Sequence, residues 1–476
     1  MSSAKNFVIG ERPLTLEQVW QWASDPVRVE IHPSVKIRMD ASRGVVDACL
    51  KDGKPHYGIN TGFGSLANTK ISDERLEELQ YNLVRSHACG VGEPFPEDIV
   101  RVMMLLRANV LAMGYSGVRY GILEHLVKFI NKGKVPRVPS QGSVGASGDL
   151  APLAHLALAL IEDGLKLEAK EGLSLINGIQ GSLAVAVIAL RDVERIITHA
   201  NSAAALTVEG LRGSDKPFDA RIADVRTQAG HREVARVIRE LIKDSKIIAS
   251  HTNCSRVQDP YSLRCVPQVH GAVMDAYAHA KDIIERELSS CTDNPLIFGR
   301  DIISGGNFHG TSIALACDSL SAAVTALGNI CERRIEQMIN PKQGELKVKY
   351  LVKDAGVNSG FMVAHVTASA LASENKALSL PAACDSITTS GGQEDYVSMA
   401  MWAARKLGMI AGNTEKIVAI ELLAAVQAID MQEERLSPGV GTKKIYDVIR
   451  KNVPMLDKDR VMYKDVEKML EVMQIL

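Results

Sequence analysis

Strong charge of either sign is missing from this chain of 476 residues. Its 55 basic and 56 acidic side chains give a formal net charge of −1. Proteins that bind nucleic acid or an anionic membrane surface present a basic patch or stripe, so the composition argues against both kinds of partner. Aromatic residues are also scarce, at 4%. Because sheet proteins are usually richer in aromatics, this scarcity favours helical structure.

Closely spaced cysteines and long apolar runs are absent as well. No C-x-x-C pair exists, which excludes the common zinc and thioredoxin-like motifs, and we predict no metal site. We expect several thiols to be buried as small hydrophobic side chains in a reducing compartment. The N-terminal residues do not resemble a secretory signal, and no apolar run approaches the ~20 residues that span a bilayer, so we expect a soluble, cytoplasmic protein. The eight cysteines are Cys49, Cys89, Cys254, Cys265, Cys291, Cys317, Cys331 and Cys384.

Hydrophobic residues make up 46% of the chain, enough for a sizeable core. In Thr311–Ile339 apolar side chains recur every three or four residues, which predicts a helix with one face buried in a bundle. The same spacing predicts further helices over Leu16–Ser24, Ser42–Asp52, Asp98–Gly114, Gly181–Leu211, Val269–Leu288, Gly360–Leu378 and Thr414–Met431, the last capped by Asn413.

The fold predicted from this pattern is mainly α. A large bundle of long antiparallel helices is expected in residues 101–476, carrying the most unusual loop of the chain. A smaller mixed region is expected in residues 1–100, where the apolar pieces Phe7–Ile9 and Val35–Met39 alternate with short helices.

Polar, glycine-rich segments interrupt the helical pattern, and such loops commonly carry function. The most unusual is Ser140–Leu153, which reads Ser-Gln-Gly-Ser-Val-Gly-Ala-Ser-Gly-Asp-Leu-Ala-Pro-Leu. It is not a phosphate loop, because no Gly-Lys-Ser/Thr follows at the required spacing. It is not a nucleophile elbow, because Asp149 stands where the second glycine is needed. A plain flexible turn and a chemical role remain.

The chemical role is condensation of Ala146-Ser147-Gly148 with itself. The Gly148 amide nitrogen can attack the Ala146 carbonyl carbon and close a five-membered ring. Loss of that oxygen as water, and of the Ser147 hydroxyl as a second water, leaves an exocyclic methylidene group. Glycine at position 148 has no Cβ to block the bent backbone, and Gly142 and Gly145 permit its compression. The product is a strong electrophile built from the chain, so no external cofactor is needed.

The run GSVGASGDLAPLAHLAL around this tripeptide resembles the signature of the aromatic amino-acid ammonia-lyases, which carry a 4-methylidene-imidazol-5-one prosthetic group. The resemblance extends from Leu14 to about Arg460. It implies a prosthetic group made from residues 146–148, a small-molecule amino-acid substrate, and a homotetramer in which each active site draws residues from three chains.

Other loops match the family residue by residue. Tyr57, in YGINTGFG, resembles the family's catalytic base, and a phenol with a pKa near ~10 needs positive charge or donors to act near neutrality. The run QDPYSLRCVPQ is similar to the segment that supplies a second active-site tyrosine and a substrate-carboxylate arginine. Alone, these residues would be an aromatic plug in a turn and a surface ion pair. The resemblance assigns Tyr261 to catalysis and contacts with the substrate or prosthetic group to Asn177, Gln258, Arg264 and Phe308.

Two segments bear on the substrate. Ser86-His87 and Gln393-Glu394-Asp395 resemble the histidine-specific forms in the family. Glu394 can accept from an imidazole N–H or pair with imidazolium, whereas opposite a phenyl ring it would be a buried, unpaired charge. His87 can bond the other ring nitrogen. We therefore predict a carbon–nitrogen lyase that converts L-histidine to trans-urocanate and ammonia.

The sequence departs from the family pattern beside Glu394. Tyr396 stands where the histidine enzymes usually have His, Ser390-Gly-Gly replaces Ser-Ala-Asn, and the connection from Leu160 to Glu171 is short. These differences leave open a tyrosine-type substrate or a histidine derivative. A tyrosine or phenylalanine ammonia-lyase, or a 2,3-aminomutase, is the alternative within the same chemistry. A helical assembly protein without activity is the alternative from another class.

Overall fold

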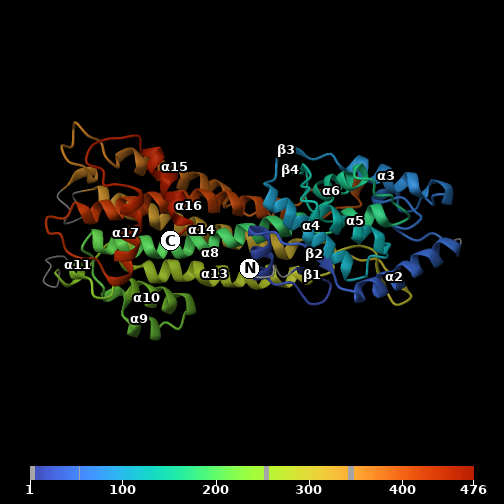
Figure 1. Cartoon of the computed structure of the whole chain (residues 1–476), viewed down its shortest axis with the longest axis horizontal. Helices are drawn as coiled ribbons and strands as arrows, with labels where there is room; N and C mark the ends of the chain where they lie inside the picture. Colours follow the sequence, from blue (N-terminus) through green and yellow to red (C-terminus); the bar gives the residue numbers. More distant parts are fainter. Residues whose placement is uncertain (1–5, 53, 251–256, 341–347) are drawn as a thin grey trace. The chain divides into compact units, whose positions relative to one another are not determined.

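Helices dominate the computed structural model, which describes residues 6–52, 54–250, 257–340 and 348–476 (Figure 1). The described residues form eighteen α-helices and three two-stranded sheets, so the predicted mainly α fold is confirmed. The predicted boundary at residue 100 stays a prediction. By internal contacts the chain forms two compact units, each assembled from three separate segments. The first unit comprises Met1–Ala189, Lys281–Asp318 and Pro381–Arg405, and the second comprises Leu190–Ala280, Ser319–Leu380 and Lys406–Leu476.

The first unit combines short helices with small sheets. The helix α1 begins with a capping box, in which Thr15 accepts from the Gln18 amide and the Gln18 side chain accepts from the Thr15 amide. The helix α3 packs on α6 and α7, and α4 packs on α5. The helices are α1 (Leu16–Ser24), α2 (Ser34–Lys51), α3 (Leu76–His87), α4 (Glu97–Ala112), α5 (Tyr120–Asn131), α6 (Leu150–Glu162) and α7 (Glu171–Ile176).

Three strand pairs complete this unit. The first pair is parallel, and the other two are antiparallel. Each strand is only three or four residues long, and Ile9, Val29 and Ile297 bury their side chains in the core. The pairs are β1 (Phe7–Ile9) with β2 (Val29–Ile31), β3 (Val91–Pro94) with β4 (Pro139–Gln141), and β5 (Leu296–Phe298) with β6 (Asp301–Ile303).

Four long helices contribute residues to both units: α8 (Gln180–Gly210), α13 (Val266–Leu288), α14 (Thr311–Ile339) and α16 (Ala400–Asp430). Within the second unit they run side by side (Figure 1) and are joined by buried polar groups. Arg334 on α14 donates to Glu421 on α16 at 2.6 Å, and Thr207 on α8 donates to the same carboxylate at 2.9 Å. Both charged side chains are 0% exposed, so each depends on the other for an opposite charge.

Shorter helices complete the second unit. They are α9 (Ala220–Asp224), α10 (Ala229–Leu241), α11 (Lys246–Ala249), α12 (Tyr261–Arg264), α15 (Met362–Leu378), α17 (Val440–Asn452) and α18 (Met462–Met473).

Most predicted helices lie within a few residues of the observed ones, but two predictions were wrong. Val35–Met39 is not a separate apolar piece, because α2 begins at Ser34. Asn413 is not a cap, because it lies inside α16, where its side chain donates to Glu374 at 3.2 Å. Glycines at 408 and 412 weaken the local helix signal, yet apolar burial on both sides of Asn413 carries the helix through.

The helix α14 alone among the described helices is long and apolar enough, by length and composition, to cross a membrane. Asp318 interrupts its apolar residues, in keeping with the expectation that no uninterrupted apolar run spans a bilayer. However, 61% of the most apolar 18-residue stretch of α14 is buried within the protein. Leu320, Val324 and Leu327 are each 0% exposed, which is typical of a core helix.

The described cysteines form no disulfide with one another, and only some are buried. Cys317 and Cys331 are buried, as expected. Cys89 and Cys384 are exposed, which the apolar surroundings in the sequence did not predict. The remaining described thiols are half-buried, and Cys254 lies outside the described residues.

Candidate active site

The segment between β4 and α6 forms a compressed turn in the first unit. Gly145, Ser147 and Gly148 have φ values of +83°, +53° and +79°. For Ser147 this left-handed conformation costs about 1–2 kcal/mol, because its Cβ crowds the following carbonyl. Such a turn persists only where the surrounding structure holds it.

Two neighbouring segments hold the turn. The Asp149 amide donates to the Gly178 carbonyl at 2.7 Å, and Gly148 and Gly178 form a bridge. A Cβ at Gly148 would clash with the Gly178 backbone, lying 2.6 Å from its carbonyl carbon. On the other side, the Met399 amide donates to the Val144 carbonyl at 2.9 Å. The glycine required at position 148 thus permits a direct approach of two backbones.

Asp149 ties the end of the turn to its beginning. Its buried carboxylate accepts from the Ser182 amide at 2.6 Å, from the Ser182 hydroxyl at 2.8 Å and from the Ser143 hydroxyl at 3.0 Å. Burial raises the pKa of Asp149, and these donors oppose the rise. No role was predicted for this residue from the sequence, although an acid directly ahead of a helix was a usable signal.

Glu394 reaches the centre of the turn. The Ser147 hydroxyl donates to Oε1 of Glu394 at 3.2 Å, and the Thr389 hydroxyl donates to Oε2 at 3.0 Å. The Thr389 amide also donates to the Glu394 carbonyl at 2.9 Å, which fixes the backbone of this loop. Two residues that are far apart in the sequence, both predicted to act in the site, are therefore in direct contact.

A cavity of about 360 Å³ opens beside the turn, and His87 is one of the residues that line it. His87 ends α3, and its Nδ1 lies 2.8 Å from the Leu83 carbonyl. Since a carbonyl only accepts, Nδ1 carries a proton. The lining residues are Ser86, His87, Cys89, Gly142, Ser143, Val144, Ala146, Gly148, Leu150 and Ala151.

The charge state of His87 follows from its surroundings. Burial lowers its pKa, whereas the Leu83 carbonyl and Glu394 act in the opposite direction. A neutral ring with its proton on Nδ1 leaves Nε2 as a hydrogen-bond acceptor. The side chain can therefore receive an N–H from a ligand.

Tyr57 lies half-buried in the loop ahead of a 3₁₀ turn, Gly64–Leu66. Burial raises the pKa of its phenol, the Gly64 N–H lowers it, and Glu394 raises it. A tyrosine that acts as a base needs a positive charge nearby. Within the described residues, none of the influences on the pKa of Tyr57 is a positive charge. A Cβ at Gly64 would lie 2.6 Å from the Ser390 hydroxyl, so this loop approaches the loop that carries Glu394.

Asn177 caps the end of α7 and is fully enclosed. Its side-chain nitrogen donates to the Asn294 carbonyl at 3.1 Å, and its carbonyl accepts from Arg107 at 2.9 Å. Its Oδ1 is buried and has no hydrogen-bond partner among the described residues. A buried acceptor beside Gly178 suits a residue that contacts a bound molecule.

The remaining predicted residues are distributed over both units. Gln258, Tyr261 and Arg264 belong to the second unit, where Arg264 lies over the Tyr261 ring, 4.4 Å from its centroid. Tyr261 is 69% exposed. Phe308 is half-buried in the first unit. The first unit thus brings the tripeptide together with Glu394 and the cavity that contains His87, whereas the second carries the predicted carboxylate clamp.

Ring stacking joins two further segments of the first unit. His309, next to Phe308, stacks on Tyr396 with centroids 5.9 Å apart and planes 16° apart. Tyr396, the residue that departs from the family pattern, therefore has a defined partner two positions from Glu394.

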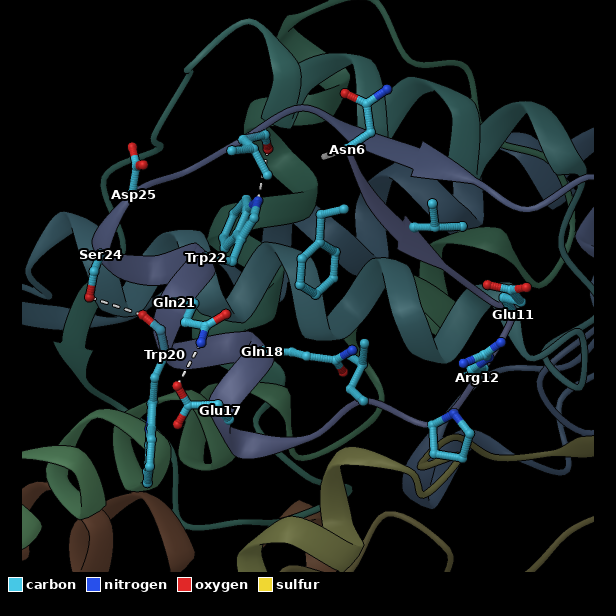
Figure 2. A pocket seen from close by; sticks show the side chains of 15 residues that line it. Asn6, Glu11, Arg12, Glu17, Gln18, Trp20, Gln21, Trp22, Ser24 and Asp25 are labelled. Atoms are coloured by element: carbon cyan, nitrogen blue, oxygen red, sulfur yellow. Dashed lines mark hydrogen bonds between the residues drawn. The ribbon is translucent and has the colours of Figure 1, made fainter. Parts of the chain in front are cut away.

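A larger cavity, of about 830 Å³, lies at the N-terminal end of the first unit (Figure 2). Figure 2 shows Glu17 and Gln21 bonded to each other, and the Trp22 ring nitrogen donates to the Val27 carbonyl at 2.9 Å. Its lining, drawn from residues 6–27, includes none of the predicted site residues. Although this cavity is larger than the one beside the turn, its lining gives no reason to regard it as the candidate active site.

One group of possible metal ligands occurs in the described residues. Donor atoms of Cys49, Asp52 and His56 lie within 4.8 Å of one another. His56 and Asp52 bond directly at 2.8 Å, so this group also has a local role in closing the turn ahead of Tyr57. The sequence, with its widely spaced cysteines, gave no sign of it.

Comparison with known proteins provides independent information. A family model described as aromatic amino acid lyase matches residues 14–165 and 162–451. The histidine ammonia-lyase of Myxococcus xanthus strain DK1622 is 46% identical over 491 residues, covering 98% of this chain and 96% of that protein.

Solved structures give the same result. The crystal structure of histidine ammonia-lyase from Trypanosoma cruzi superposes with a TM-score of 0.90 at 38% identity, covering 99% of this chain and 94% of that one. Tyrosine aminomutase from Streptomyces globisporus superposes with a TM-score of 0.92 at 34% identity, covering 99% and 97%.

Proposed function

The chain belongs to the aromatic amino acid lyase family and is a carbon–nitrogen lyase, and we propose that it eliminates ammonia from L-histidine to give trans-urocanate. The observation that carries this proposal is the cavity that His87 shares with Ala146 and Gly148, beside the contact between Ser147 and Glu394. The extensive identity to histidine ammonia-lyases supports the same substrate.

The residues present fit the expected 4-methylidene-imidazol-5-one, which would form from Ala146, Ser147 and Gly148. The turn is already compressed, its backbone is held at Gly178, and the unpartnered Oδ1 of Asn177 lies buried next to that glycine. Once formed, the group supplies an electrophilic methylidene that turns the substrate amine into a better leaving group. No external cofactor is required by this chemistry.

Recognition of imidazole follows from two acceptors. His87 Nε2 accepts one ring N–H, and the Glu394 carboxylate accepts the other when the ring is protonated. A phenyl ring would leave both groups without a partner in a partly desolvated site. Sites built to hydrogen-bond a substrate group reject analogues that lack it by about 10⁴–10⁵.

Proton abstraction is assigned to Tyr57, which removes a β-proton from the substrate. Within one chain the pKa of this phenol is raised, so the assembled enzyme must bring positive charge to it. Arg264, whose buried Nε has no partner among the described residues, supplies such a charge and clamps the substrate carboxylate. We assign Tyr261 to proton transfer, and Gln258 and Phe308 to the wall of the site.

These assignments require a homotetramer with shared active sites. A second copy would cover the exposed ring of Tyr261 and place Arg264 beside another chain's tripeptide. The free, exposed thiols of Cys89 and Cys384 suit a reducing compartment, and we propose a cytoplasmic enzyme. Sedimentation velocity tests the assembly: a monomer with full activity would contradict it.

A substrate assay tests the proposed reaction. Purified protein is supplied separately with histidine, tyrosine and phenylalanine, and the absorbance of urocanate, coumarate or cinnamate is followed. We expect urocanate from histidine. Coumarate from tyrosine without urocanate would overturn the proposal.

A tyrosine 2,3-aminomutase is the second candidate, because the aminomutase from Streptomyces globisporus superposes as well as the histidine enzyme does. Tyr396 beside Glu394 is the local feature that favours it. Chiral analysis of the tyrosine reaction for a β-amino acid decides between them, since a lyase releases only the unsaturated acid and ammonia.

A further inference from the structure

Ser147 and Glu394 are in contact in the unreacted chain, before any substrate has a role. The hydroxyl that must leave as water donates to Oε1 of Glu394 at 3.2 Å. Oε2 is held by the Thr389 hydroxyl at 3.0 Å, and the backbones of Thr389 and Glu394 are bridged. The carboxylate is therefore fixed beside the leaving group by its own loop.

The other carboxylate of the turn is committed elsewhere. Both oxygens of Asp149 accept hydrogen bonds, one from Ser143 and the other from Ser182. Those bonds hold the two ends of the turn together, which makes Asp149 a positioning residue. Glu394 is the acid that touches the reacting hydroxyl.

We propose that Glu394 moves the proton in the dehydration of Ser147, which gives it a role in maturation as well as in substrate recognition. This inference rests on the proposed function, because only that function requires the condensation. The carboxylate takes the proton from Ser147 Cα, and the electrons of that C–H bond form the Cα–Cβ double bond. As the Cβ–Oγ bond breaks, the same carboxyl group gives its proton to Oγ. Water leaves, and the carboxylate is restored.

The proposal separates the two water losses of maturation. Ring closure between Gly148 and Ala146 forms the first water and does not use the Ser147 hydroxyl. Dehydration of Ser147 forms the second and depends on a group that can both accept and donate a proton. An amide at position 394 can hold the hydroxyl but cannot carry a proton, so the variant E394Q isolates the second step.

Intact-mass measurement over time tests this. Protein is purified shortly after the start of expression and incubated, and samples are weighed by mass spectrometry. We expect wild type to become lighter than its translated sequence by two waters. We expect E394Q to accumulate a form lighter by one water, with the second loss slowed by about 10²–10⁴-fold, the usual contribution of a general acid–base group.

Matched variants control for charge and folding. Glu97→Gln removes an acid whose side chain is 70% exposed and paired with Arg101, and it should mature like wild type. Glu394→Asp keeps a carboxylate and should restore part of the second step. Thr389→Val removes the bond to Oε2 and should slow that step without abolishing it. Circular dichroism and size-exclusion chromatography confirm that each variant is folded.

The outcomes are distinguishable. Wild type that keeps the full translated mass overturns the proposed function itself. Wild type that loses two waters, with E394Q maturing at the same rate but failing to turn over histidine, overturns the maturation role and leaves the proposed function standing. If E394Q does not fold, Thr389→Val decides: a slowed second step supports the role, and a wild-type rate overturns it.

Discussion

Compression of the turn should be measurable at Gly145. This residue has a φ of +83°, and a Cβ placed on it would clash with the Ser398 hydroxyl. Gly145→Ala therefore adds two costs. A left-handed alanine costs about 1–2 kcal/mol, and the steric conflict costs about 1–3 kcal/mol, so the folded turn loses about 2–5 kcal/mol.

The structure also predicts how to remove one of these costs. After Ser398→Ala, the new Cβ at position 145 would have its closest neighbours at 3.3 Å and 3.4 Å, the Cβ of residue 398 and the amide nitrogen of Met399. These distances need only a small adjustment. The double variant should therefore recover most of the steric term and keep only the backbone strain, about 1–2 kcal/mol.

Two measurements follow the series. Urea unfolding gives the stability of wild type, each single variant and the double variant, and intact mass gives the fraction that has lost two waters. We expect Gly145→Ala to be destabilised and to mature slowly, and the double variant to be intermediate. Ser398→Ala should lose at most the modest hydrogen bond that the Ala400 amide donates to the Ser398 hydroxyl. Two results together would show that the turn is not held as described: Gly145→Ala matures at the wild-type rate, and adding Ser398→Ala to Gly145→Ala leaves the stability of that variant unchanged.

Four further predictions follow from the same structure. Ser147→Ala should abolish both the mass deficit and turnover while leaving the folded helical content intact by circular dichroism; full activity would refute the proposed chemistry. His87→Leu should lower kcat/KM for histidine about 10–10²-fold, which corresponds to about 1.4–2.7 kcal/mol of lost hydrogen bonding, with an unchanged melting temperature. A large fall in melting temperature alongside the loss of activity would mean that His87 is structural. Burial lowers the pKa of His199 to about 4, from the ordinary value of about 6.5 for histidine, so the unfolded state binds the proton first. Stability should therefore fall by up to about 3 kcal/mol as pH drops from 6.5 towards 4. Urea midpoints at several pH values, compared with those of His199→Leu, measure this, and an identical pH profile for both proteins would contradict it. Arg334→Met should destabilise the second unit by about 3–5 kcal/mol, because it leaves the buried Glu421 carboxylate without an opposite charge. Thermal unfolding measures this, and a melting temperature close to that of wild type would contradict it.

Sequence alone could propose only the parts of the site that one short segment contains. Residues 146–148, His87 and Glu394 were singled out because each lies in a local segment that resembles the family, and their roles stay predictions. The long apolar stripe of Thr311–Ile339 has the same limits in the structure. A repeat of three and four residues over several turns predicted this helix correctly, whereas Asn413 shows that a single start signal can be overridden by burial on both sides of it.

The parts that sequence could not predict are those in which two distant segments meet. The clamp on Asp149 uses Ser182, and the fit at Gly145 depends on Ser398. Neither pairing leaves a periodic or motif signal, because it exists only once the chain has folded. The raised pKa of Tyr57 belongs to the same class, since burial and Glu394 come from the tertiary structure.

The bridge between Gly148 and Gly178 has a consequence for engineering. The two residues are thirty positions apart, and a Cβ on Gly148 would clash with the Gly178 backbone, while a Cβ on Gly178 would clash with Gln180, Thr292 and Arg107. Transplanting Ala-Ser-Gly into another helical scaffold would therefore transfer only one of the two segments that form the compressed turn. The recipient would also need a second loop, bare of side chains at one point and rigid enough to press against the first.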